Sequence, residues 1–329
     1  MLIYPSDLAT HAKEASKKLH IENIDLPKID FIIGGPPCQS FSLVGKRSKN
    51  DERGTLVFKY LEIIQEKRPK AFVMENVPGM AASKYNGVRL TVFLEKKFTA
   101  LGYKVTILKL DASEYLVPQK RKRIFIIGTP RKQFIKPDSV FFAKQVHNLS
   151  YSKFDIGAKS AIGDLGKVVE LGKLASYNRS KPSLFAELMR DKETKRVSLH
   201  EIPTMSEKDK ELISFIPPGG NYLNVPDEFA TQRILNFKKT GGRTTAYARL
   251  HKDNPSYTVN TQFRRPNVGS NIHYKKSRLI SAREAMRFQS IPDRITINNI
   301  TKTDRNILIG NAVPYLLAQS IAFNLLKYI

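Results

Sequence analysis

Between residues 29 and 128, short apolar runs alternate with longer segments whose apolar residues recur at helical spacing. The runs at 29–33, 71–74, 103–110 and 123–128 have the length of strands. The segments "TLVFKYLEIIQEK" and "VRLTVFLEKKFTALG" have helical spacing, and they stop before Pro69 and at Gly102, respectively. Because the first two runs are continuously apolar, we expect strands buried on both faces. The alternation predicts an α/β sheet with parallel strands in its centre.

The sequence pattern changes at about residue 154. The periodic spacing of apolar residues weakens, and "PPGGN", "KKTGGR" and "RRPNVGSN" are typical of loops. Signals of regular secondary structure resume near Ser277. The stretch "SARE" is a capping box that begins a short helix, which ends before Pro292, and a last helix follows Pro314. We therefore predict one domain over residues 1–153, a smaller irregular domain over 154–276, and a return to the first domain over 277–329.

The charge of the chain indicates a polyanionic partner. Lys and Arg number 55 against 30 Asp and Glu, which gives a net charge of +25. Such an excess favours nucleic acid as the partner, although a Lys-rich proteome would also make surfaces basic. No apolar run has the length of a membrane span, and the N-terminal residues lack the apolar core of a signal peptide. One cysteine excludes an internal disulfide and a cysteine-rich zinc site. We expect a cytoplasmic protein without membrane contact or a metal site.

Two reactive side chains follow predicted strands. Cys38, the one cysteine, comes after the run 29–33 through the stiff turn Gly34-Gly35-Pro36-Pro37, and Glu75 ends the run 71–74. Because open α/β sheets place their sites beyond the carboxyl ends of strands, the two could act as nucleophile and acid. Taken singly, a lone cysteine is more often a small buried apolar residue, and a glutamate here could cap the next helix.

A pair of arginines begins the run 123–128. Arg121 and Arg123 are two positions apart, so in an extended strand they would face the same side. Paired guanidinium groups in this position can hold a phosphate or a base edge. An equally good interpretation is that these basic side chains are simply exposed to solvent where the strand begins.

Together and in order, these motifs resemble the DNA (cytosine-5-)-methyltransferase family. The stretch "GGPPCQSFS" is similar to the nucleophile loop of that family, "MENVPGM" to its ENV motif, and "QKRKR" to its Q-x-R-x-R motif. Two further stretches, "RLISAREAMRFQSIPD" and "GNAVP", are similar to its last two motifs, and "IPPGGN" and "ARLHKDNPSYTVNT" to parts of its target-recognition region. The likeness extends from residue 29 nearly to the end of the chain.

The resemblance implies a fold, a reaction and partners. The fold would be an S-adenosylmethionine-dependent methyltransferase (Rossmann-like) sheet with a smaller irregular target-recognition domain. Cys38 would attack C6 of a cytosine flipped out of double-stranded DNA, Glu75 would hold N3, Arg123 would contact O2, and Arg121 would assist. Pro37, Leu56 and Asn311 would touch the S-adenosylmethionine. The setting would be the modification arm of a restriction-modification system.

One segment of the family pattern is not present before residue 29. Members begin with a glycine-rich F-x-G-x-G turn that binds the cofactor, whereas the first 28 residues contain no glycine and "LATHAKEASKKLHIENIDLP" has the pattern of a helix. We therefore expect a sheet truncated at its N-terminus, with a separate polypeptide, an upstream segment or a recent truncation as competing explanations. A tRNA cytosine-5 methyltransferase and an inactive DNA-binding remnant are the alternative functions.

Overall fold

The computed structural model describes residues 29–37, 55–190, 193 and 195–328, which fall into two compact units. Of the described residues, the sheet unit contains those up to 114, 122–142 and those from 319. The loop-rich unit contains 115–121 and 143–318. Cys38 and the helix predicted before residue 29 lie outside the described residues.

The sheet unit is built on four strands in the order β1-β2-β6-β5. Their bounds are β1 Phe31–Gly34, β2 Ala71–Asn76, β5 Lys104–Asp111 and β6 Lys122–Thr129. All four strands are confirmed, but the prediction of parallel strands in the centre is wrong. Among the strands that the structure describes, only β1 and β2 run parallel, and β6 lies antiparallel between β2 and β5. The chain turns back between β5 and β6 through residues 112–121, so β6 enters the sheet antiparallel to both of its neighbours, β5 and β2.

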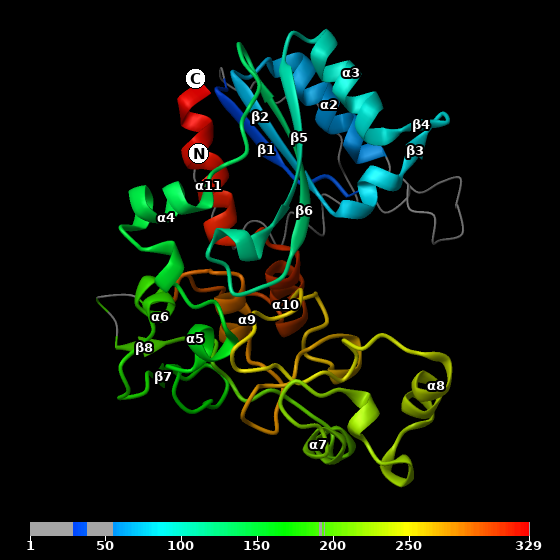
Figure 1. The fold of residues 1–329 in the computed structure, drawn as a ribbon, viewed down its shortest axis with the longest axis vertical. Coiled ribbons are helices and arrows are strands. Elements are labelled where there is room, and N and C mark those ends of the chain that lie inside the picture. Colours follow the sequence, from blue (N-terminus) through cyan, green and yellow to red (C-terminus); the bar gives the residue numbers. More distant parts are fainter. Residues whose placement is uncertain (1–28, 38–54, 191–192, 194, 329) are drawn as a thin grey trace. The chain divides into compact units, whose positions relative to one another are not determined.

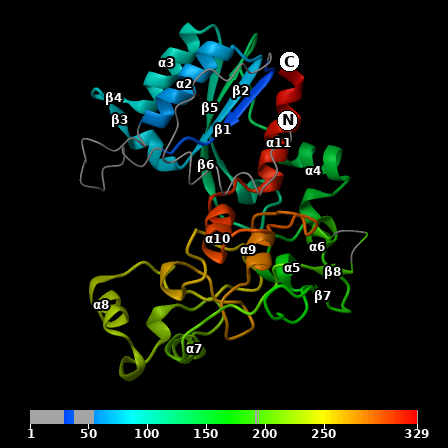
Figure 2. The same cartoon turned by 180° about the vertical axis from the view of Figure 1, so that it is seen from behind.

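Two helices cover one face of this sheet and enclose its core. Figures 1 and 2 show α2 (Thr55–Lys67) and α3 (Leu90–Ala100) together on one side, with α11 (Tyr315–Leu325) on the other. Phe72 lies at the centre of the core, with its ring 4.3 Å from that of Phe98. On the neighbouring strand, a Cβ at Gly128 would lie 2.0 Å from the Phe72 ring, so the glycine makes room for this ring.

The first strand is more exposed than its sequence predicts. β2 is buried along almost its whole length, as expected, whereas Ile33 in β1 is 72% exposed. Among the described strands, β1 pairs with β2 alone and is therefore an edge strand. A continuously apolar sequence thus does not by itself distinguish a central strand from an edge strand.

Short elements complete the sheet unit. Gly102 has a φ of 91° directly after the C-cap of α3, which confirms it as the residue that ends this helix. The short elements are η3 Pro78–Ala82, β3 Lys84–Tyr85, β4 Val88–Arg89, η4 Ala112–Tyr115, α4 Ser139–His147 and η9 Leu326–Tyr328, of which η4 and α4 cross into the loop-rich unit. No single helix in the described part of the chain meets the length and apolarity needed to cross a membrane. The bent pair of Lys302–Asn311 with Tyr315–Tyr328 meets them only when joined.

The loop-rich unit has short helices and two strands of two residues each. Its helices are α5 Ala158–Ile162, α6 Leu184–Met189, α7 Glu207–Ser214, α8 Gln232–Thr240, α9 Ala282–Phe288 and α10 Lys302–Asn311, with η5 Tyr151–Lys153, η6 Tyr222–Asn224, η7 Asp227–Phe229 and η8 Pro266–Val268. The strands are β7 Ala175–Ser176 and β8 Arg196–Val197. The capping box is confirmed, because Ser281 accepts from the Glu284 amide and the Glu284 side chain accepts from the Ser281 amide. The last helix, α11, is confirmed as well.

The units have different bounds from the predicted domains. Residues 277–318 belong to the loop-rich unit, and only those from 319 join the sheet unit. The physical reason is the packing of α9 against α5, which Arg287 reinforces from within α9. Its guanidinium is fully buried, and it donates to the Ala161 carbonyl at 3.0 Å and pairs with Asp164 at 3.2 Å and Asp293 at 2.6 Å.

Burial disfavours the charged form of Arg287, but hydrogen bonds and charges from Asp293 and Asp164 outweigh it and raise its pKa. Replacing Arg287 with Met should therefore lower the free energy of unfolding by about 3–5 kcal/mol, since buried carboxylates lose their counter-charge. Urea denaturation followed by circular dichroism measures this change. The control is Lys210→Met, which removes an exposed pair with Glu207 and should cost about 1 kcal/mol or less. Equal losses in the two variants would contradict the role given to Arg287.

Candidate active site

The strand register brings three chain segments to one edge of the sheet. β1 and β2 are parallel, with Gly34 opposite Met74, so their carboxyl ends meet there. β6 is antiparallel to β2 and begins at the same edge, where Asn76 lies opposite Ile124. The Gly-Pro turn, the end of β2 and the start of β6 therefore converge.

Glu75 and Arg123 form an ion pair at this edge. Arg123 Nε lies 2.8 Å from Glu75 Oε1, and the two side chains are 12% and 16% exposed, respectively. Arg123 Nη1 also donates to the Lys122 carbonyl at 2.8 Å, which fixes the plane of the guanidinium. Burial lowers the pKa of Arg123, and the charge and hydrogen bond of Glu75 oppose that decrease. The pair holds a carboxylate and a guanidinium in a fixed, largely desolvated arrangement.

Asn76 connects the Gly-Pro turn to β2. Its side chain is buried, and Nδ2 donates to the Pro36 carbonyl at 2.7 Å while Oδ1 accepts from the Val77 amide at 2.9 Å. A Cβ at Gly35 would lie 3.1 Å from Glu75 Oε2, so the turn approaches the carboxylate closely. Asn76 is not among the site residues expected from the sequence, although its place after Glu75 in the ENV motif was the available signal.

The remaining predicted residues of the sheet unit lie as follows. Pro37 is exposed at the end of the turn, and it directly precedes Cys38, which is outside the described residues. Leu56 lies half-buried in the first turn of α2. The described part of the chain therefore reaches this edge and stops at Pro37, one residue before the predicted nucleophile.

Arg121 does not share a strand face with Arg123. β6 begins at Lys122, so Arg121 lies before the strand, and the prediction that both arginines lie on one face of a strand is wrong. The Arg121 side chain is fully buried, and it donates to the Val259 carbonyl at 2.9 Å and to the Gly310 carbonyl at 2.8 Å. These acceptors hold its guanidinium inside the loop-rich unit.

Gln119 makes the same kind of contact two residues earlier. Its side chain is fully buried, donates to the Phe288 carbonyl at 3.0 Å and accepts from the Val259 amide at 2.8 Å. The first two polar positions of the Q-x-R-x-R motif therefore link the end of α9, the segment around Val259 and the end of α10. Asn311, the last residue of α10, is exposed beside this link.

Gly310 provides a direct test of this link. A Cβ there would lie 2.4 Å from the Thr261 amide nitrogen and 2.6 Å from the Asn260 carbonyl carbon, both of which are backbone atoms. Gly310→Ala should therefore lower the free energy of unfolding by about 1–3 kcal/mol, because backbone has to move. Gly79→Ala is the matched control, since a Cβ there meets nothing within 4 Å, and it should change stability by less than about 0.5 kcal/mol. Thermal or urea unfolding compares the two, and a neutral Gly310→Ala would refute the close packing.

The sequence matches one family of DNA methylases over nearly its whole length. The family model for the C-5 cytosine-specific DNA methylase matches residues 4–327. The chain is 30% identical over 310 residues to the Type II methyltransferase M1.HphI of Haemophilus parahaemolyticus, covering 93% of this chain and 71% of that protein. It is also 30% identical over 311 residues to M.DdeI of Desulfomicrobium norvegicum, covering 91% and 73%.

Solved structures share the fold. A prophage-encoded protein of E. coli, described as a DNA modification methyltransferase, matches with a TM-score of 0.65 at 24% identity, covering 99% of this chain and 85% of that one. The Dnmt2 methyltransferase of S. pombe matches with a TM-score of 0.54 at 15% identity, covering 99% and 83%. These likenesses concern the mixed α/β fold alone, and the family follows from the sequence match over nearly the whole chain. The chain belongs to the C-5 cytosine-specific DNA methylase family.

Proposed function

We propose that this chain is the modification methyltransferase of a type II restriction-modification system and methylates C5 of cytosine in a specific sequence of double-stranded DNA. The observation that carries the proposal is the Glu75–Arg123 pair, held at the sheet edge beside the Gly-Pro turn that leads to Cys38. A carboxyl group and a guanidinium directed to one place can bind the N3 and O2 edge of a cytosine. The sequence relatives, which are named Type II methyltransferases, support the setting.

The chain's own residues would act on the base in a fixed order. The Cys38 thiolate forms a bond to C6, and Glu75 stabilises the resulting ring at N3 by hydrogen bonding or proton donation. Arg123 orients Glu75 and contacts O2. After the methyl group has been added, a water molecule takes the C5 proton, the electron pair of that bond re-forms the C5–C6 double bond, and Cys38 leaves C6 as the thiolate, which releases 5-methylcytosine. The base has to be flipped out of the duplex, because these atoms cannot be reached in the stack.

S-adenosylmethionine supplies the methyl group when it is bound. The described residues fit this cofactor in that Pro37 and Asn311 are exposed and Leu56 is half-buried, so none of the three is closed off by packing. The resemblance to the family's motifs assigns Pro37, Leu56 and Asn311 to the contacts with this cofactor. Arg121, which is bound by two carbonyl groups, would assist as a positioning residue of the loop-rich unit and would not touch the base.

We further propose that a separate polypeptide completes the cofactor pocket. The supporting observation is the edge position of β1 among the described strands and the 72% exposure of Ile33 on it. An apolar edge strand of this kind is suited to pairing with a further strand. Equilibrium dialysis with labelled S-adenosylmethionine tests this proposal, and stoichiometric binding by the chain alone would overturn it.

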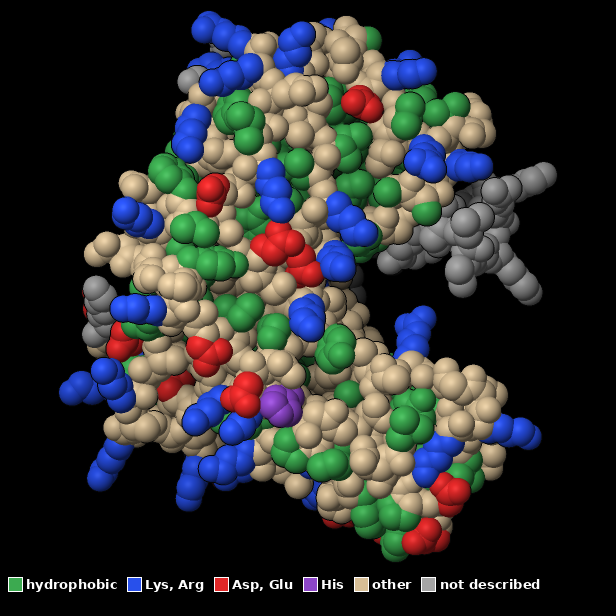
Figure 3. Space-filling model, viewed as in Figure 1, with side chains coloured by type: hydrophobic (Ala, Val, Ile, Leu, Met, Phe, Trp, Pro, Cys, Tyr) green, Lys and Arg blue, Asp and Glu red, His purple; other side chains and the backbone are tan. Residues whose placement is uncertain are grey.

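The loop-rich unit offers a basic surface for reading DNA. Arg243 and Arg265 are exposed on loops held in place by hydrogen bonds, from the Ala246 amide to the Arg243 carbonyl and from the Tyr247 amide to the Pro266 carbonyl, both at 2.8 Å. A hollow of about 370 Å³ adjoins these loops and is lined by Arg233, Phe237, Thr240, Gly241, Gly242, Arg243, Thr245, Ala246, Asn267 and Val268. Figure 3 shows Lys and Arg side chains spread widely over the face in view, with fewer Asp and Glu. Rigid loops that carry arginine can contact phosphates and base edges in a major groove.

The proposed chemistry predicts separate effects at two residues. Glu75→Gln should lower methyl transfer to DNA by about 10²–10⁴-fold, because the amide cannot donate a proton to N3. Cys38→Ser should abolish both transfer and the covalent adduct with DNA that contains 5-fluorocytosine. Transfer of labelled methyl groups and denaturing electrophoresis measure these effects. An adduct that persists in Cys38→Ser would exclude this cysteine as the nucleophile.

The DNA surface predicts a change in salt dependence. The double variant Arg243→Gln/Arg265→Gln should weaken binding to duplex DNA and reduce the slope of log K against log salt by about 2, one unit for each lost phosphate contact. Lys208→Gln/Lys210→Gln, with the same change in net charge on exposed α7, should leave the slope unchanged. Fluorescence anisotropy across a salt series measures both. Equal slopes in the two double variants would show that Arg243 and Arg265 do not contact DNA phosphates.

A further inference from the structure

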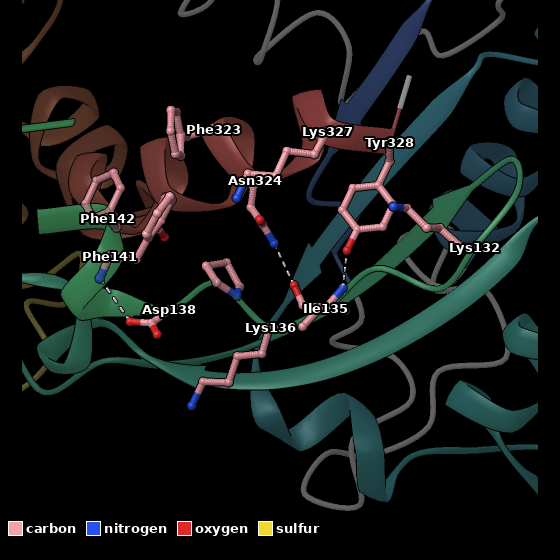
Figure 4. A pocket seen from close by; sticks show the side chains of 12 residues that line it. Lys132, Ile135, Lys136, Asp138, Phe141, Phe142, Phe323, Asn324, Lys327 and Tyr328 are labelled. Atoms are coloured by element: carbon pink, nitrogen blue, oxygen red, sulfur yellow. Dashed lines mark hydrogen bonds between the residues drawn. The ribbon is translucent and has the colours of Figure 1, made fainter. Parts of the chain in front are cut away.

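A second pocket lies in the sheet unit, at the end of β6 remote from Arg123. β6 ends at Thr129, and its eight residues separate the two ends by about 25 Å at about 3.3 Å per residue. The pocket has a volume of about 390 Å³ and is lined by Lys132, Ile135, Lys136, Pro137, Asp138, Phe141, Phe142, Ser320, Phe323, Asn324, Lys327 and Tyr328 (Figure 4). All of these residues belong to the sheet unit. The proposed methyl transfer gives this pocket no role.

The pocket is lined by three lysines, and two of them have no carboxylate partner among the described residues. Within the described part of the chain, no carboxylate lies within ion-pairing distance of Lys132 or Lys327, whereas Lys136 pairs with Glu114 at 2.8 Å. The one acidic residue of the lining, Asp138, caps α4, accepting from the Val140 and Phe141 amides at 2.8 and 3.0 Å. An anion would therefore meet two lysines and little repulsion.

Aromatic rings lie directly beside these lysines. Lys327 Nζ is 4.8 Å from the centre of the Phe141 ring and 5.5 Å from that of Phe323, and Lys132 Nζ is 5.1 Å from that of Tyr328. Phe141 is 44% exposed, and Ile135, on the same lining, is 70% exposed. A bare anion would leave this apolar surface in water, whereas a planar ring attached to the anion would cover it.

The pocket is built on fixed backbone. The Ile135 amide donates to the Tyr328 hydroxyl at 2.9 Å, and its carbonyl accepts from Asn324 Nδ2 at 2.7 Å, as Figure 4 shows. Thr129 Oγ1 donates to the Lys132 carbonyl at 2.7 Å. The segment after β6 is thus attached to α11 and η9 on one side and to the end of its own strand on the other. A ligand would meet a largely formed site of the size that proteins use for small molecules.

We propose that this pocket binds a small aromatic anion, with a nucleoside monophosphate as the representative class. Lys132 and Lys327 contact the anionic group, and Phe141 and Ile135 cover the ring. Because the pocket lies at the other end of β6 from Glu75 and Arg123, the proposal is independent of the methyl transfer. The ligand is a separate molecule from the cytosine and the methyl donor.

Calorimetric titration of the full chain with AMP tests the proposal, with S-adenosylhomocysteine present in excess so that a cofactor site cannot account for the signal. We expect one AMP per chain, with adenosine and inorganic phosphate each binding at least tenfold more weakly. Lys132→Gln/Lys327→Gln should weaken AMP binding at least tenfold. Phe141→Leu should weaken AMP by about tenfold and leave phosphate unchanged, since stacking on a base contributes to that extent.

The matched control is Lys84→Gln/Lys109→Gln, two exposed lysines of β3 and β5 whose replacement changes the net charge equally. It should bind AMP as the unmodified chain does. Absence of AMP binding, equal loss in the two double variants, or phosphate binding as tight as AMP binding would each overturn the proposal. DNA methylation is not the readout, so failure here and failure of the proposed function are distinguishable.

Discussion

The loop-rich unit depends on guanidinium groups that are buried against backbone carbonyls. Arg121, Arg283 and Arg287 are among the largest fully buried side chains of the described structure. The strands described in this unit have two residues each, so ladders pair few of its loop carbonyls, and a guanidinium offers five donors in a rigid plane. Arg283 thus binds the carbonyls of Ser198 and Ile295, which joins separate loops. Because an unpaired buried charge is costly, each such arginine fixes its acceptors in place.

The candidate active site depends instead on strand register. Glu75 and Arg123 come from antiparallel neighbours and meet only because Glu75 lies opposite Phe125 in the ladder. A shift of one residue would turn either side chain to the other face of the sheet. The side-chain amide of Asn76 donates to the Pro36 carbonyl and so links the Gly-Pro turn to the same strand. A sheet buried on one face by α2 and α3 therefore provides the rigidity that a preorganised carboxylate and guanidinium require.

Much of the local structure could be predicted from the sequence. Apolar periodicity together with Pro and Gly located α2, α3 and the strands, and the Ser281–Glu284 capping box located α9, because these signals act within a few residues. The antiparallel insertion of β6 could not be predicted, since it depends on which segments pair across the sheet. The role of Asn76 needed the position of the Pro36 carbonyl, which belongs to the turn after β1, 40 residues earlier in the sequence.

The sequence alone determined the family, because motifs in a fixed order carry that information whatever the three-dimensional arrangement. It also identified Glu75 and Arg123 as polar residues where strands end and begin. Only the tertiary structure decided that Arg121 and Arg123 have different surroundings, although a single residue separates them. One guanidinium is enclosed by the carbonyls of Val259 and Gly310, and the other pairs with Glu75. The physical reason is that a guanidinium binds whichever acceptors surround it, and those acceptors come from distant parts of the chain.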